Sequence, residues 1–228
     1  MKLKKYYFIT TIFLLLCTIA LHAQKSNTGN WFIYFGNQKI KKKWNWHNEV
    51  QYRNFNFMGD LSQLLVRTGI GYNLTENNNN ILLGYGFINS QKYLSNSNEK
   101  VGTNEHRVFQ QFITRQSFNK VFLQHRYRIE ERFLPNDFQM RFRYFLGINI
   151  PINKPRLEKN AYYFSAYNEI FINAQQNIFD RNRLYGAIGY IFNKNIKMEA
   201  GYMAQTLEST NRNQFQIVIF NNIPFNKN

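Results

Sequence analysis

Two neighbouring stretches, Val121–Arg132 (VFLQHRYRIEER) and Phe138–Ile150 (FQMRFRYFLGINI), alternate large apolar residues with arginines and other polar residues. Successive side chains of a β-strand point to opposite faces, so a period of two predicts two strands, each with one apolar and one polar face. An apolar face of this length needs cover from a second sheet or from lipid. If lipid covers it, the arginines face the lumen of a barrel.

The start of the chain favours the lipid alternative. Three lysines and an apolar run from about Tyr6 to Leu21 come first, and Ala23 supplies a small residue at a plausible cleavage point. This order is typical of a secretory signal peptide. The run is shorter than the ~20 residues of a membrane-spanning helix, so an N-terminal anchor is the weaker alternative. We therefore expect a signal peptide over residues 1–23 and a single outer-membrane β-barrel over residues 24–228.

The composition of the mature chain limits the kinds of site and partner that we expect. Cys17 lies in the predicted signal peptide and is the single cysteine, so no disulfide or thiolate metal site is expected. Removing three lysines from the 29 basic residues leaves 26 against 13 acidic residues, a net charge of +13. Nucleic-acid binding is not expected despite this charge, because a secreted chain does not meet nucleic acid and no recognition motif is present. Lysines in turns are better placed to meet the head groups of outer-membrane lipid.

Segments with strand character recur along the whole chain. They cover residues 31–39, 43–55, 61–74, 81–94, 104–118, 121–132, 138–150, 160–173, 181–193, 196–208 and 213–225. Barrel strands need ~9–11 residues to cross the apolar layer, so these lengths fit. Segment 104–118 also has helical spacing, but its β-rich neighbours favour a hairpin. Bacterial single-chain barrels have even strand numbers, so we expect an all-β, transmembrane, antiparallel up-and-down barrel of ten or twelve strands.

The connections between these segments differ in length. Tight joints lie near 40–43, 119–120 and 193–195, and longer ones near 95–103, 133–137, 174–180 and 208–212. Outer-membrane barrels have short turns at one end and longer loops at the other, outer end. The alternation therefore predicts two unlike ends.

Glycine and aromatic residues also follow the two faces. Gly-Tyr pairs at 71–72, 84–85, 189–190 and 201–202 put glycine on the polar face and tyrosine on the apolar face. Glycine leaves room in a crowded lumen, and tyrosine suits the aromatic girdle at the lipid–water boundary. We expect Trp31, Trp44 and Trp46 in the same girdle. The alternative is that these aromatics form the core of a soluble β protein.

Arginines lie within the strands on the polar face, whereas lysines gather in turns. The residues expected to line the lumen are Arg53, Arg67, Glu105, Arg107, Arg126, Arg128, Glu130, Arg141, Arg143, Glu169 and Arg183. Pairing of arginine with glutamate would brace the barrel wall. The excess of arginine would attract small anionic solutes. A plugged structural barrel and a narrow anion channel therefore both stay open.

An enzymatic function has weaker support. No histidine pair has metal-ligand spacing, no nucleophile motif is present, and no cofactor or metal is expected. Distant strands can still bring catalytic groups together. His47 on the polar face and Asp60, Asp137 and Asp180 near connections form a candidate rim site for a hydrolase acting on lipid or peptide. His106 lies on the face opposite to Glu105.

An ordered set of short motifs carries a family resemblance. The motifs are Tyr52-Arg53, RTGIGY at 67–72, Gly84-Tyr85, NEHRVFQQ at 104–111, RYRIEER at 126–132, RFRY at 141–144, Asn168-Glu169, Asn182-Arg183 and Gly189-Tyr190. Together they resemble the outer-membrane barrel family filed as domain of unknown function 2490, common in Gram-negative bacteria such as the Bacteroidota. The resemblance covers nearly the whole mature chain. It implies an outer-membrane location and a barrel fold, and it supplies neither an activity nor an oligomeric state.

Overall fold

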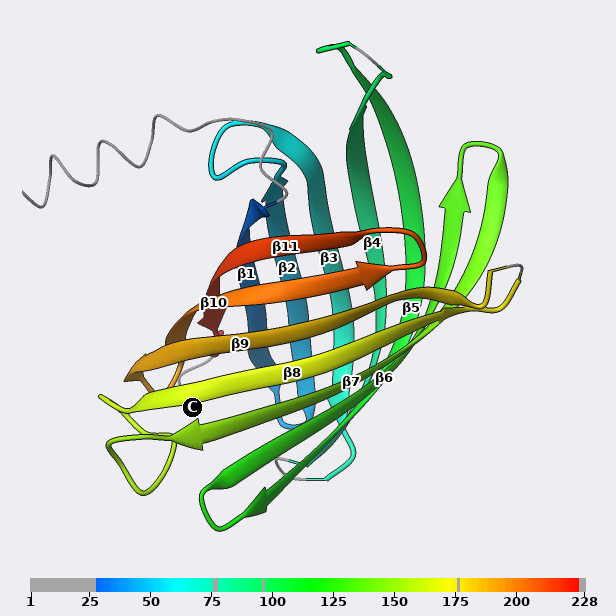
Figure 1. The fold of residues 1–228 in the computed structure, drawn as a ribbon. Helices are drawn as coiled ribbons and strands as arrows, with labels where there is room; N and C mark the ends of the chain where they lie inside the picture. Colours follow the sequence, from blue (N-terminus) through cyan, green and yellow to red (C-terminus); the bar gives the residue numbers. More distant parts are fainter. Residues whose placement is uncertain (1–27, 76–77, 96, 176, 226–228) are drawn as a thin grey trace, which may run out of the picture.

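Eleven strands close into a β-barrel in the computed structural model, which describes residues 28–75, 78–95, 97–175 and 177–225 (Figure 1). The strands are β1 (Thr28–Lys41), β2 (Trp44–Asn54), β3 (Leu61–Asn73), β4 (Asn79–Tyr93), β5 (Lys100–Phe118), β6 (Val121–Leu134), β7 (Asp137–Pro151), β8 (Tyr162–Asn173), β9 (Phe179–Asn193), β10 (Ile196–Leu207) and β11 (Asn211–Asn221). Each predicted segment corresponds to one of them, and segment 104–118 is a strand. The described residues include no helix long and apolar enough to cross a membrane. The predicted signal peptide lies outside the described residues.

The barrel closes through a parallel pair. Each strand from β1 to β11 pairs with the next in antiparallel fashion, and β1 pairs with β11 in parallel from Thr28–Asn213 to Gly36–Asn221. An odd number of alternating strands leaves the first and last strands pointing the same way, so their contact must be parallel. Eleven lies within the predicted range, but the expectation of an even number was wrong.

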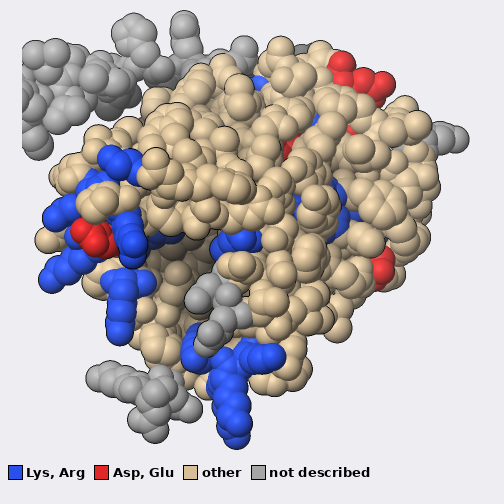
Figure 2. Space-filling view, turned by 90° about the horizontal axis from the view of Figure 1, so that it is seen from below, with Lys and Arg blue, Asp and Glu red and all other residues tan. Residues whose placement is uncertain are grey.

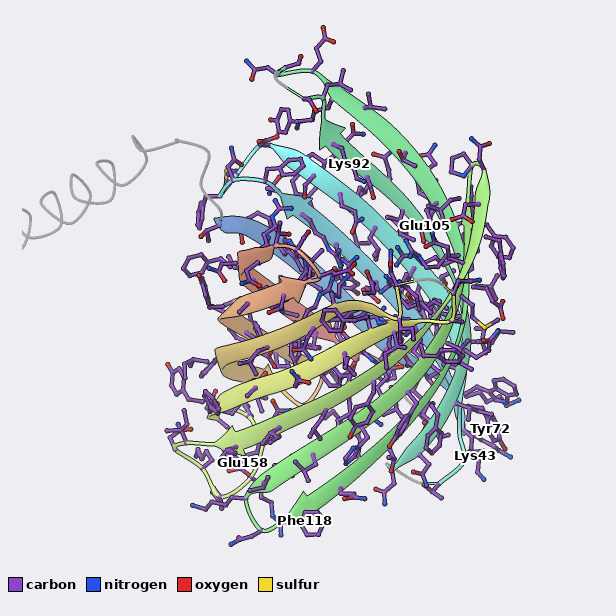
Figure 3. All side chains as sticks on the ribbon, turned by 45° about the vertical axis from the view of Figure 1, so that its right-hand side comes forward. Lys43, Tyr72, Lys92, Glu105, Phe118 and Glu158 are labelled. Atoms are coloured by element: carbon purple, nitrogen blue, oxygen red, sulfur yellow. The ribbon has the colours of Figure 1, made fainter. Side chains whose placement is uncertain are left out.

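The two ends of the barrel carry different connections. One end carries the two-residue turns 42–43, 119–120 and 194–195, and we call it the lower end because the turn between β5 and β6 lies at the bottom of Figure 1. The other, upper end carries the loops 55–60 and 94–99, and the loop between β4 and β5 lies at the top of Figure 1. Lys43 and Phe118 mark the lower end in Figure 3, and Lys92 marks the upper end.

The predicted tight joints therefore share one end, but the predicted contrast is incomplete. The longest connection, 152–161, also lies at the lower end, and the predicted longer joint 133–137 is a two-residue turn at the upper end. Positive φ angles at Lys42 (41°) and Asn119 (54°) fit the tight hairpins, because two-residue turns of this kind need left-handed backbone.

The barrel wall places apolar residues outside and charged residues inside, the reverse of a soluble protein. Tyr127 and Phe142 face outward and are 49% and 42% exposed. Arg128 and Arg143, which alternate with them, face inward and are 3% and 7% exposed. The predicted alternation thus places an apolar surface outside and a charged surface inside the barrel.

Glycines make room for large interior side chains. The ring of Phe109 packs against Gly84, and the ring of Tyr163 packs against Gly189, where an added Cβ would overlap the ring in each case. Trp44 lies on the outer face, as expected for a girdle residue. The prediction for Trp31 was wrong: this residue faces the interior and is buried, because it shares its side of β1 with Ile33.

Candidate functional site: the barrel lumen

A cavity of about 800 Å³ occupies the interior of the barrel. Its lining extends from Asn37 and Asn149 near the lower end to Ser90 and Thr210 near the upper end. Figure 2 looks into the hollow from below and shows basic side chains inside it. The lumen is therefore partly filled by side chains and partly open space.

All eleven residues expected in the lumen point into the interior. Ten of them line the cavity, and Glu130 is fully buried among their side chains. The same interior surface also holds charged residues outside that set: Glu49, Lys92, Arg115, Arg132, Asp180, Arg181, Lys197, Glu199 and Arg212. The alternation along β5 and β6 also places Arg115 and Arg132 inward. Arg212 was missed because β11 begins two residues before the predicted segment.

The inner faces of β3 and β5–β8 form a dense ion-pair cluster that we call the arginine wall. Glu130 on β6 lies at its centre. Five guanidinium groups approach its carboxylate to within 4.0 Å: Arg143 at 2.5 Å, Arg141 at 2.6 Å, Arg67 and Arg128 at 3.5 Å, and Arg107 at 3.7 Å. Because these arginines come from four strands, one buried carboxylate links β3, β5, β6 and β7.

Two further carboxylates extend the arginine wall. Arg143 also donates to Glu169 at 2.6 Å, and Arg126 donates to the same Glu169 oxygen at 2.7 Å. Glu105 on β5 accepts from Nε of both Arg107 and Arg132 at 2.6 Å. Charge-assisted contacts of this length are strong and directional, so the arginine wall holds its strands in register.

The opposite inner surface, on β1 and β8–β11, differs in chemistry, and we call it the aromatic wall. It is defined by the buried residues Trp31, Ile33, Tyr185, Ala187, Met203 and Val218, with Phe35, Tyr167 and Phe220 packed against them. Gln214 on β11 belongs to the same wall and is fully buried. Neither its side-chain oxygen nor its nitrogen has a hydrogen-bond partner among the described residues.

Three cavity-lining arginines have no carboxylate within 4.0 Å in the described part of the chain: Arg53, Arg115 and Arg212. Arg53 instead donates to Gln51 at 2.8 Å and lies 3.8 Å above the ring centre of Trp31. Arg115 donates to Gln124 at 3.1 Å. None of these three guanidinium groups therefore forms an ion pair within 4.0 Å among the described residues.

The interior as a whole carries an excess of positive charge. Twelve arginines line the cavity within the described residues, and the carboxylates that meet them or share the lining number six: Glu49, Glu105, Glu130, Glu169, Asp180 and Glu199. Within the described residues the arginines that line the cavity therefore outnumber these carboxylates by two to one, and the formal charge of the lining is positive.

The candidate rim site for a hydrolase is not assembled. His47 lies in the lower half of β2 and contacts Glu49 at 3.4 Å, whereas Asp60 lies at the upper end and pairs with Lys100. Asp180, also toward the upper end, is held by Arg141 and Arg181. The described residues contain no group of three or more potential metal ligands among histidine, cysteine, aspartate and glutamate.

Comparison with known sequences returns one family. The sequence model described as "Protein of unknown function (DUF2490)" matches residues 28–216, from the start of β1 into β11. No curated protein and no solved structure matches the chain.

Proposed function

The chain belongs to the DUF2490 family, and from the chemistry of its lumen we propose that it is an outer-membrane barrel that admits small anionic solutes. The excess of arginine over carboxylate along the cavity carries this proposal. A plugged structural barrel needs only matched charges, because each unpaired buried charge destabilises the fold. Arg53, Arg115 and Arg212 have no carboxylate match in the part of the chain that the structure describes, so the lumen holds more cations there than bracing requires.

The outer surface supports the membrane location. Large apolar side chains such as Leu83 and Leu184 are 59% and 61% exposed on it. A water-soluble monomer rarely exposes a continuous apolar belt, whereas a transmembrane barrel presents one to lipid. The predicted signal peptide over residues 1–23 agrees with export to the outer membrane of a Gram-negative cell.

Swelling of liposomes that contain the full barrel tests the proposal. Gluconate and glucose have similar size but differ in charge, so we expect gluconate to enter faster than glucose. In the triple variant Arg53→Gln, Arg115→Gln and Arg212→Gln the anion preference should fall by about tenfold, because the unpaired cations are gone. The matched control carries Lys41→Gln at the end of β1 and Lys120→Gln and Lys194→Gln in turns, which removes the same charge from outside the cavity lining. Equal rates for both solutes in the unmodified protein would contradict an anion pathway.

A further inference from the structure

The aromatic wall changes character along the barrel axis. On β11 the inward residues run from Arg212 and Gln214 at the upper end to Val218 and Phe220 below. On β9 they run from Arg181 and Arg183 to Tyr185 and Ala187. Two strands thus repeat the same order, with polar and cationic groups above and apolar groups below.

The cationic part lies directly over the upper edge of the apolar part. The guanidinium carbons of Arg53 and Arg183 lie 3.8 Å and 5.0 Å from the ring centre of Trp31. Arg53 has no carboxylate partner among the described residues, and Arg183 approaches Glu169 no closer than 3.8 Å. Two guanidinium groups therefore lie against one aromatic ring, and neither has a close carboxylate partner among the described residues. Both can donate hydrogen bonds to a bound anion.

The apolar part forms a stripe along the cavity. Trp31, Ile33 and Phe35 are successive inward residues of β1, and all three line the cavity. Alternate residues of a strand are separated by roughly 6.6 Å, so this stripe is roughly 13 Å long. A hydrated inorganic anion gains nothing from such a surface, whereas an aliphatic or aromatic chain buries its own apolar area against it.

Gln214 supplies a separate indication of a ligand. Its side chain is fully buried and belongs to the cavity lining, and neither its donor nor its acceptor has a partner among the described residues. Buried polar groups nearly always have a partner, so an unpartnered amide that lines a cavity is placed to contact a bound molecule. Gln214 pairs with Gly29 on β1, two positions from Trp31, and Trp31 pairs with Arg53 on β2, so Gln214 and Arg53 flank the same upper part of β1.

We propose that the lumen binds an amphipathic organic anion, with its carboxylate at Arg53 and Gln214 and its apolar chain along Trp31, Ile33 and Phe35. This inference rests on the proposed function, because the ligand must enter the lumen, and it narrows the solute class to acids with an apolar chain. Both parts of the site are needed: the guanidinium and amide select the head group, and the stripe selects the chain.

Fluorescence of Trp31 provides the test. The variant Trp44→Phe with Trp46→Phe leaves Trp31 as the single tryptophan, and it is studied as the full barrel in zwitterionic nanodiscs. Dodecanoate should change the emission saturably. Acetate has the head group without the chain, and dodecanol has the chain without the head group, so both should leave it unchanged. In this background Arg53→Gln should weaken dodecanoate binding by about tenfold or more, as expected for loss of a charge-assisted hydrogen bond.

Controls separate binding from misfolding and from partition into lipid. Lys194→Gln, in a turn outside the lumen, should leave dodecanoate affinity unchanged, and Ile33→Asn should weaken it without removing any charge. A far-ultraviolet circular dichroism spectrum equal to that of the background variant reports that each variant has folded. An equal response to dodecanol, or a dodecanoate response that Arg53→Gln does not change, would overturn the inference.

The two proposals fail separately. Faster entry of gluconate without any Trp31 response to dodecanoate would overturn the amphipathic site and keep the anion pathway. Saturable dodecanoate binding without anion entry would keep the site and overturn the pathway.

Discussion

The arginine wall surrounds one buried carboxylate with five guanidinium groups. At the aromatic wall, by contrast, the described residues supply no carboxylate for Arg53, which lies over Trp31, and no hydrogen-bond partner for the Gln214 side chain. Both walls line the same cavity. They differ in how completely the buried polar groups are satisfied.

That difference separates bracing from binding. A buried charge that has lost its water needs partners, and the arginine wall supplies them from neighbouring strands. Its arginines therefore bind carboxylates of the protein itself rather than a ligand. At the aromatic wall, hydrogen-bonding groups without a protein partner lie next to apolar surface, and ligand sites have this composition. Changes to the arginine wall should therefore affect stability most, and changes to the aromatic wall should affect binding most.

Removing the central carboxylate of the arginine wall should have the largest effect on stability. Glu130→Gln leaves five guanidinium groups close together without their shared anion, so we expect a loss of about 3–5 kcal/mol in the free energy of unfolding. Urea unfolding in lipid vesicles, followed by tryptophan fluorescence, measures it. Glu158→Gln in the exposed connection 152–161 is the control and should be neutral. Equal stability of the two variants would show that the cluster does not brace the barrel.

Crowding the arginine wall should cost less. Gly84→Leu drives a side chain into the ring of Phe109, which itself lies under Arg128, so we expect a loss of about 1–3 kcal/mol. Gly186→Leu is the matched control, since nothing lies within 4 Å of the added Cβ. The same unfolding assay compares them. A control variant as unstable as Gly84→Leu would point to a general intolerance of bulk in the strands.

Changing the aromatic wall should have a smaller effect on stability. Trp31→Phe keeps an apolar ring beneath Arg53 and Arg183 but weakens both cation–π contacts, so we expect a loss of about 1 kcal/mol. Urea unfolding followed by circular dichroism measures this loss without relying on the deleted fluorophore. A loss as large as that of Glu130→Gln would erase the contrast between the walls.

The smallest effect is expected outside both walls, at the tip of the upper end. Lys100 at the start of β5 pairs with Asp60, and this hydrogen bond raises the pKa of Lys100. A raised pKa stabilises the fold below the ordinary value of 10.5 and loses that contribution as the pH rises past the raised value. Asp60→Asn should cost at most about 1 kcal/mol at neutral pH and nothing at strongly alkaline pH. Unfolding curves at both pH values would reveal a pH-independent loss, which would contradict this account.

Much of the wall was predictable from local sequence, because alternation alone assigns each face of β6 and β7. Arg128, Glu130 and Arg143 could be placed inside in this way. Trp31 could not be placed in this way, because the segment WFIYF at 31–35 is apolar on both faces and has no alternation that distinguishes the inner from the outer face.

Features set by closure were beyond local patterns. Arg67 and Glu130 are 63 positions apart and meet because the barrel brings β3 and β6 to one interior. The alternation identifies both as inward residues but does not select Glu130, rather than Glu105 or Glu169, as the central carboxylate. The odd strand number was also not predictable from local sequence, because the parallel pairing of β1 with β11 produces no pattern in the sequence of either strand.

The reversal potential of a planar bilayer that contains the full barrel, under a KCl gradient, tests the central claim most directly. The excess of lumen arginines predicts current with a reversal potential displaced toward that of chloride, and a smaller displacement when Arg53, Arg115 and Arg212 are all replaced by glutamine. A reversal potential displaced toward that of potassium, or the absence of any current, would contradict the account.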